Sequence, residues 1–141
     1  MAGVPLVLRG HVYDRRCRLA PHALLDFFQA DSHGRYDRNE IRLHGHQFTD
    51  ARARYVLRTI VPNHYLRRPP HIHVKVQAPY GPVLATQLFF PATLRAYGMR
   101  VGSLNAHDRT WRRTKGALVV HLRRRTRFGY AATFDFVIEV S

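Results

Sequence analysis

Apolar and polar residues alternate with a period of two along most of this chain, and proline, glycine and charged residues interrupt the alternation at short intervals. Such alternation is typical of β-strands that bury one face. Six or seven short strands separated by turns predict an all-β sandwich or barrel with little helix. We expect strands within residues 7–14, 23–30, 49–62, 71–78 and 83–91, and a closing hairpin formed by 116–127 and 131–141. A short helix from Pro21 is the alternative to the strand at 23–30, but the surrounding strands favour the latter. Residues 92–115 are expected to be irregular or weakly helical.

The length of 141 residues suits a single domain spanning residues 1–141, which is long enough to bury a core. Cys17 is the one cysteine, so an internal disulfide is excluded, which fits a reducing compartment. The first residues lack the basic head and apolar run of a signal peptide, and no stretch reaches the ~20 apolar residues that a membrane helix needs. We therefore expect a cytoplasmic protein without a membrane partner.

The formal net charge of +14 comes almost wholly from arginine. A field of this sign attracts anions, such as nucleic acid, anionic lipid or small carboxylate and phenolate substrates. The clusters "RTWRRTKG" and "HLRRRTR" suit a nucleic-acid patch, but Trp111 is their only aromatic residue, so a platform for stacking bases is poorly supported. A general bias towards arginine, with most side chains solvated, explains the charge equally well.

The stretch "HIHVKV" places two histidines one residue apart within an expected strand. Successive side chains of a strand face opposite ways, so His71, His73 and Lys75 share one face. The residues on the other face are apolar and are expected to be core: Ile72, Val74 and Val76. Two neighbouring imidazoles suit iron, copper or zinc. The alternative is a pair of polar residues on a strand that faces solvent.

A second pair of histidines with the same spacing occurs in "RLHGHQF". Gly45 separates His44 from His46, and the segment is expected to be a short loop or a strand at the edge of a sheet. We interpret these two histidines as surface residues.

Tyrosines, rather than carboxylates, are the available partners for His71 and His73. The nine acidic residues include none close to these histidines in sequence, whereas Tyr65 lies six residues before His71 and Tyr36 follows a Gly-Arg turn. A phenolate is a hard, anionic ligand, and a trivalent metal lowers its pKa from about 10. Two phenolates and two neutral imidazoles would reduce the charge of iron(III) to about +1.

Five segments in the same order resemble the intradiol ring-cleavage dioxygenases, the catechol and protocatechuate type of non-haem iron(III) enzyme. The first contains "GHVYDRRC", "DFFQAD" and "HGRY", and the second is "FTDARARYVLRTIVPNHY". The others are "RPPHIHVKV", "LATQLFF" and "AATFDFVIEV". The resemblance runs from about residue 8 to the end and implies a β-sandwich of mixed short strands.

Carried over residue by residue, the resemblance implies that four side chains bind iron(III): Tyr36, Tyr65, His71 and His73. Tyr65 would be released when a catechol chelates the iron. Arg68 matches the arginine that stabilises the carbanionic form of the substrate, which a permanently charged guanidinium suits. Gln87 matches the glutamine that orients this arginine.

Several positions depart from the family pattern. The tryptophan expected before "QAD" is Phe28, which keeps an aromatic ring. Ala53 stands where a glycine is expected and implies a different turn, whereas Asn63, also at a glycine position, tolerates the left-handed conformation that a turn requires. Cys17 matches a family cysteine and is expected to be a small buried core residue.

The resemblance implies cleavage of a catecholic ring between its two hydroxylated carbons, with O2, to a muconate-type diacid. The partners would be a small aromatic diol and O2, with nucleic acid disfavoured and a homo-oligomer left open. Two alternatives are a catalytically silent metal-binding β-sandwich and a basic nucleic-acid-binding β module.

Overall fold

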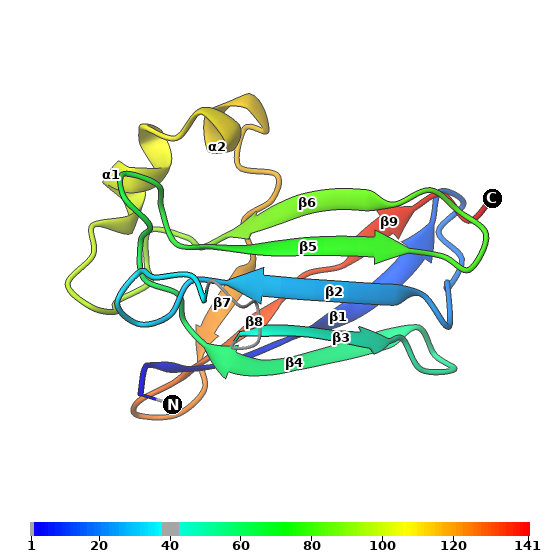
Figure 1. Ribbon diagram of the computed structural model, residues 1–141, viewed down its shortest axis with the longest axis horizontal. Helices are drawn as coiled ribbons and strands as arrows, with labels where there is room; N and C mark the ends of the chain where they lie inside the picture. Colours follow the sequence, from blue (N-terminus) through cyan, green and yellow to red (C-terminus); the bar gives the residue numbers. More distant parts are fainter. Residues whose placement is uncertain (1, 38–42) are drawn as a thin grey trace.

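The computed structural model describes residues 2–37 and 43–141, and within these ranges it contains two β-sheets and two short helices. Figure 1 shows the sheets packed face to face as a sandwich. The strands and helices are β1 (Pro5–Asp14), β2 (Leu24–Gln29), β3 (His44–Phe48), β4 (Arg54–Ile60), β5 (His71–Gln77), β6 (Leu84–Phe89), α1 (Val101–Ala106), α2 (Arg109–Arg113), β7 (His121–Arg124), β8 (Tyr130–Thr133) and β9 (Phe136–Ile138). The predicted all-β sandwich with little helix is confirmed.

The first sheet has the strand order β4-β1-β8-β7, with β9 also paired to β1. The pairs β1–β4 and β7–β8 are antiparallel, whereas β8 and β9 both run parallel to β1. The expected last strand is therefore divided in two, at Phe134 and Asp135. At this point Gly10 of β1 lies so close to the Phe134 carbonyl that a Cβ on Gly10 would be 1.9 Å from its oxygen.

The second sheet has the order β3-β2-β5-β6 and is antiparallel throughout. One of its two inner strands, β5, carries the "HIHVKV" stretch. The expected apolar face is confirmed, because Ile72, Val74 and Val76 are buried in the core between the sheets. The opposite face of β5 carries His71 and His73. The segment that begins at His44 is an edge strand, β3, with His46 exposed.

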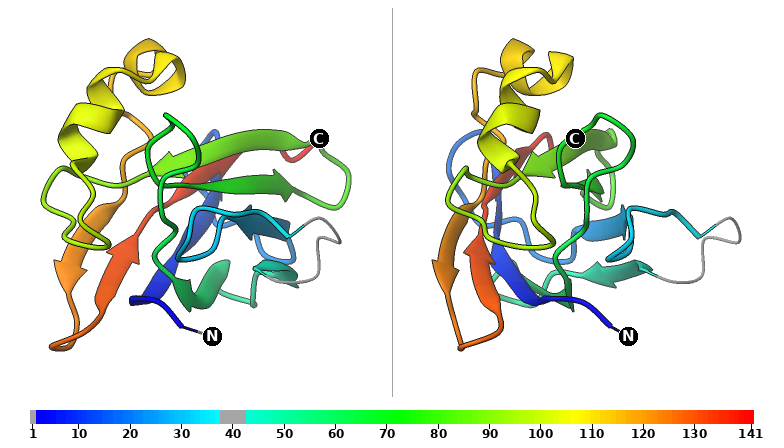
Figure 2. Two further views of the ribbon diagram at one scale, coloured as in Figure 1. Left: turned by 60° about the vertical axis from the view of Figure 1, so that its left-hand side comes forward. Right: turned by 90° about the vertical axis from the view of Figure 1, so that its left-hand side faces the viewer.

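The two helices lie beyond one end of the sandwich (Figure 2). Both fall within residues 92–115, where only weak helix was expected, and each has six residues or fewer. Asp108 caps the N-terminus of α2, and its side chain accepts a hydrogen bond from the Trp111 backbone amide. A carboxylate at this position satisfies one of the unpaired amides of the first turn. None of the described helices has the length and hydropathy needed to cross a bilayer.

Two expectations about single residues are wrong. Cys17 is exposed rather than buried, because it occupies a tight turn with a φ of 61° that directs its side chain outward. The turn is closed by Asp14, which accepts hydrogen bonds from the backbone amides of Arg16 and Arg18. At Ala53 the expected change of turn does not occur: Ala53 itself adopts a φ of 59°, the left-handed conformation in which glycine is preferred.

Candidate metal centre

The candidate site lies on the outer face of the second sheet, where β2, β5 and β6 run side by side. In the strand register His73 is flanked by Phe28 on β2 and by Gln87 on β6. The Phe28 ring stacks on the His73 imidazole, with centroids 4.2 Å apart and an interplanar angle of 6°. Phe28, at the expected tryptophan position, therefore fixes the plane of one imidazole.

Two loops bring the tyrosines to the histidines. Tyr36 follows β2, and Tyr65 lies in the connection between β4 and β5; both segments lie at the same end of the sandwich (Figure 1). The Tyr36 hydroxyl is 3.1 Å from Nε2 of His71 and 3.2 Å from Nε2 of His73. The Tyr65 ring packs edge-on against that of Tyr36, with centroids 4.9 Å apart. The structure thus brings together all four side chains singled out as candidate ligands.

The two tyrosine loops are held to each other by close backbone contacts. Gly34 has a φ of 74°, and a Cβ added to it would lie 2.2 Å from the carbonyl oxygen of His64. The Asn63 amide nitrogen Nδ2 donates to the Ser32 carbonyl, 2.9 Å away, and its backbone N–H donates to the Asp31 carbonyl. Asn63 is not among the described residues with a positive φ, so its tolerance of the left-handed conformation is not needed at this position. Its side chain instead ties the Tyr36 loop to the Tyr65 loop.

We expect Gly34→Ala to separate these loops and weaken the site. The added methyl group meets backbone rather than a side chain that can move away, so the variant should lose about 1–3 kcal/mol of stability and bind metal less tightly. Gly98→Ala is the matched control, because Gly98 has a φ of 71° but no atom within 4 Å of the added Cβ. Thermal unfolding and metal titration of both variants test this expectation, and equal losses in the two would contradict it.

His71 is held in the tautomer that a metal ligand requires. Its Nδ1 lies 2.7 Å from the Pro69 carbonyl oxygen, so Nδ1 carries the proton and Nε2 keeps its lone pair. Burial lowers the pKa of His71, and the neighbouring Arg68 charge adds to this effect against the opposing hydrogen bond to Pro69. Burial, His71 and Arg68 together lower the pKa of His73 to about 4. Both imidazoles are therefore neutral near pH 7, as ligands must be.

The donor set fits a trivalent cation. Burial raises the pKa of Tyr36, so its hydroxyl stays protonated near neutral pH without a strong positive charge beside it. Within the described parts of the chain, His, Cys, Asp and Glu alone form no cluster of three or more that could hold a metal. A site on these histidines therefore needs phenol oxygens, and phenolates suit a hard trivalent ion such as iron(III).

The metal-free protein should lose stability in acid because of His73. The pKa of His73 is about 4 in the folded chain and about 6.5 when it is unperturbed, so the unfolded chain takes up the proton first. Stability should fall by about 2 kcal/mol as the pH drops from 6.5 to 4, with the full contribution of His73 present above pH 6.5. Urea unfolding of wild type and His73→Gln at pH 7.5 and 4.5 measures the difference. The same pH dependence in both proteins would contradict this assignment.

Arg68 lies beside His71, and its guanidinium is hydrogen-bonded on every side. Nη1 is 3.3 Å from Nε2 of His71, and Nη2 donates to Oε1 of Gln87 over 2.8 Å. The structure therefore brings Gln87 to Arg68, as the resemblance implies. On the remaining edge, Nε and Nη2 donate to the two oxygens of Asp108 over 3.0 and 3.2 Å.

Sequence reasoning missed Asp108. This residue lies 35 or more positions from every predicted site residue except Gln87, and nothing in its sequence neighbourhood pointed to the histidines. The only local feature was its place within residues 92–115, which were expected to be irregular or weakly helical. Burial raises the pKa of Asp108, but hydrogen bonds from Arg68 and from the Trp111 amide outweigh burial, so the pKa lies below its usual value. Asp108 is therefore a carboxylate at neutral pH.

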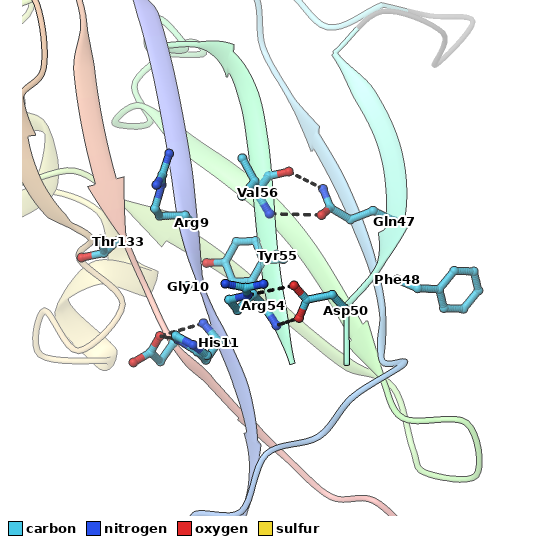
Figure 3. Close-up of a pocket in the computed structure, with 11 residues that line it drawn as sticks. Arg9, Gly10, His11, Gln47, Phe48, Asp50, Arg54, Tyr55, Val56 and Thr133 are labelled. Atoms are coloured by element: carbon cyan, nitrogen blue, oxygen red, sulfur yellow. Dashed lines mark hydrogen bonds and ion pairs between the residues drawn. The ribbon is translucent and has the colours of Figure 1, made fainter. Parts of the chain in front are cut away.

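A separate groove of about 660 Å³ lies on the first sheet and at its edge with β3 (Figure 3). The four candidate metal ligands do not line this groove: Tyr36, Tyr65, His71 and His73. Arg54 of this groove forms an ion pair with Asp50, and Nδ1 of His11 lies 3.8 Å from Oδ1 of Asp135. The Gln47 carboxamide bonds both backbone groups of Val56 and so joins the edges of the two sheets.

Comparison with known proteins identifies the family. The chain matches the family described as "Dioxygenase" over residues 1–140. The chain belongs to the intradiol dioxygenases. The protocatechuate 3,4-dioxygenase beta chain of Burkholderia cepacia is 33% identical to this intradiol dioxygenase over 107 residues, which cover 63% of this chain and 46% of the relative. The chain thus spans about half the length of that relative.

Solved structures of intradiol dioxygenases share the fold. The dioxygenase domain of a dioxygenase–carbohydrate-binding fusion from Streptomyces sp. SirexAA-E is 44% identical, with a TM-score of 0.85 over 99% of this chain and 82% of that domain. The 3-chlorocatechol 1,2-dioxygenase of Rhodococcus opacus 1CP is 23% identical, with a TM-score of 0.77 over 98% of this chain and 61% of that enzyme. The second likeness concerns the fold alone. Membership of this family disfavours the nucleic-acid-binding alternative.

Proposed function

We propose that this chain is a non-haem iron(III) dioxygenase that cleaves a catecholic ring between its two hydroxylated carbons. One molecule of O2 adds both of its atoms, so that a catechol becomes a muconate-type diacid. The partners are a small aromatic diol and O2. We also propose that residues 1–141 form one catalytic domain, in agreement with a family match that spans nearly all of them.

The observation that carries this proposal is the convergence of a phenol oxygen and two imidazole nitrogens within 3.2 Å. We propose that Tyr36, Tyr65, His71 and His73 hold the iron. When bound, iron(III) would ionise the phenols and draw electron density from a chelating catecholate, which prepares the ring to react with O2. Each nitrogen donor is oriented by a neighbour, the Pro69 carbonyl for His71 and the Phe28 ring for His73.

Tyr65 is proposed to accept a proton from the substrate. Tyr65 is 38% exposed, whereas His71 is 3% exposed. Tyr65 also lies in a connection between prolines, where its ring contacts Tyr36 and where no side chain or backbone group of the described residues forms a hydrogen bond with its hydroxyl. A phenolate at Tyr65 Oη can take one hydroxyl proton as the diol becomes a dianion, and an exposed ring is free to turn towards solvent.

Arg68 is proposed to stabilise negative charge on the substrate ring. Its Nη1 faces the same small space as Tyr36 and the two histidines, because it lies 3.3 Å from Nε2 of His71. A guanidinium stays charged at any working pH, and its side chain is 30% exposed, so its charge is only partly screened by water. Gln87 accepts a hydrogen bond from Nη2 and limits rotation of the planar group.

Oxygen uptake on a panel of catechols tests the proposed reaction directly. Iron-loaded protein should consume one O2 for each diol and form the ultraviolet absorption of a muconate. A yellow product would indicate cleavage beside, rather than between, the hydroxylated carbons and would contradict the intradiol reaction. Iron binding with no oxygen uptake on any catechol would favour a catalytically silent metal-binding sandwich instead.

A further inference from the structure

We propose that Asp108 is the residue that positions Arg68, by binding one edge of its guanidinium and leaving Nη1 directed at the site. This inference rests on the proposed function, because Asp108 acts only through Arg68, and the role of Arg68 in the reaction is itself part of that proposal. Asp108, the residue that caps α2, follows Arg68 by 40 residues in the sequence and meets it only in the folded chain.

The two edges of the guanidinium have different partners, and this difference fixes the orientation of the group. Nε and Nη2 donate to Oδ1 and Oδ2 of Asp108 over 3.0 and 3.2 Å, a two-point contact that matches the fork of a guanidinium to a carboxylate. Nη2 uses its second hydrogen on Gln87. Nη1 alone remains for the site, where it lies 3.3 Å from Nε2 of His71.

The carboxylate is itself held in place. The Asp108 side chain is 6% exposed, compared with 30% for Arg68, so the anchoring member of the pair is the more buried one. Its Oδ2 also accepts the backbone N–H of Trp111 over 3.0 Å, and its backbone N–H donates to the Asn105 carbonyl. α1, the turn between the helices and α2 therefore determine where the charge of Asp108 lies.

Without this carboxylate, Gln87 alone would hold the inner edge of the guanidinium by one hydrogen bond. A single bond permits rotation about the bond between Cδ and Nε, which a two-point contact prevents. The Nη1 group would then no longer stay beside the ring carbons that gain negative charge. Small displacements of a charged group that acts in the transition state lower the rate far more than they lower substrate binding.

Asp108→Asn and Asp108→Ser test the inference, because asparagine and serine are both favourable N-cap residues for α2. Both variants should keep the helix but lose the ionic two-point contact. We expect kcat to fall about 10- to 100-fold, with KM changed less than about 3-fold and with iron content and visible absorption unchanged. Wild-type kcat in either variant would show that Asp108 only caps α2, and would overturn the proposal.

Arg68→Lys supplies the second half of the experiment, since lysine keeps the charge but cannot form the two-point contact. If Asp108 acts through Arg68, then Asp108→Asn should lower kcat less than about 2-fold when it is added to Arg68→Lys. Losses that multiply in the double variant would overturn the proposal. An inactive wild type would instead count against the proposed function, so the two failures are distinguishable.

A measurement on the metal-free wild type does not depend on activity or on a variant that folds. Nitrogen-15 spectra of the arginine side chains should show slow hydrogen exchange at Nε of Arg68, which donates to the buried Asp108 carboxylate. Exposed Arg67 supplies the comparison in the same spectrum. Exchange of Arg68 Nε–H as fast as that of Arg67 would overturn the proposal even if no Asp108 variant could be purified.

Discussion

Tyr36→Phe should lower ring cleavage by more than about 100-fold while the chain stays folded. The substitution removes one oxygen and keeps the ring, which packs against Tyr65 and Phe28 with centroids 4.9 and 6.2 Å away. The lost oxygen is the atom within 3.2 Å of both imidazole nitrogens. Because loss of a residue that only supports a ligand already costs about 10- to 100-fold, loss of a ligand should cost more.

Steady-state kinetics and iron content of Tyr36→Phe measure this effect. Tyr80→Phe is the control, because Tyr80 is 92% exposed and its hydroxyl lies outside the candidate site. The control should match wild type in both assays. Retention of full activity and iron by Tyr36→Phe would show that the convergence of Tyr36 with the histidines is a structural contact only.

Arg68→Gln should lower kcat by about 100- to 1,000-fold with little change in iron binding. The substitution removes the positive charge beside the reacting ring, and the loss of one preorganised donor for a developing anion has this magnitude in other enzymes. No candidate ligand is altered, so the visible absorption of the iron-loaded protein should persist. The variant would thus separate the role of Arg68 from that of the metal ligands.

Arg67→Gln is the matched control for this prediction. Arg67 precedes Arg68 and is exposed, so its removal changes the net charge by the same amount without touching the site. Equal losses of kcat in the two variants would mean that the overall positive field, rather than the placement of Arg68, acts on the substrate. In that case, rapid-quench or stopped-flow measurements on a single turnover should show that substrate binding, rather than ring cleavage, has become slower.

Much of the fold follows from alternation alone. Strand β5 shows why: apolar residues at every second position bury one face in the core, and the same alternation places His71 and His73 on the other face, where His71 is buried and His73 half-buried by the neighbouring loops and side chains. Strand β9 could not be separated from β8 in this way, because the break depends on the close approach of Gly10 to Phe134, which are distant in sequence. The exposure of Cys17 likewise depends on a local turn rather than on hydrophobicity.

The candidate site was predictable where its residues stand in short motifs. His71, His73 and Arg68 lie within six positions of one another, and the tyrosines were placed by the family pattern. The supporting contacts carry no comparable signal. Asp108 meets Arg68 only because α2 folds back over the end of the sandwich, and Asn63 bonds Ser32 only because two loops pack together. Such contacts require the tertiary structure.

Titration of the metal-free protein with iron(III), followed by visible absorption, tests the central claim most directly. Ionised tyrosines bound to iron(III) give a broad charge-transfer band, so the account predicts a burgundy colour that saturates at one equivalent. The band should weaken in Tyr36→Phe and in Tyr65→Phe and be absent when both are changed. A solution that stays colourless after one equivalent, or a band unaffected by the double substitution, would contradict a site built from these two phenols and the paired histidines.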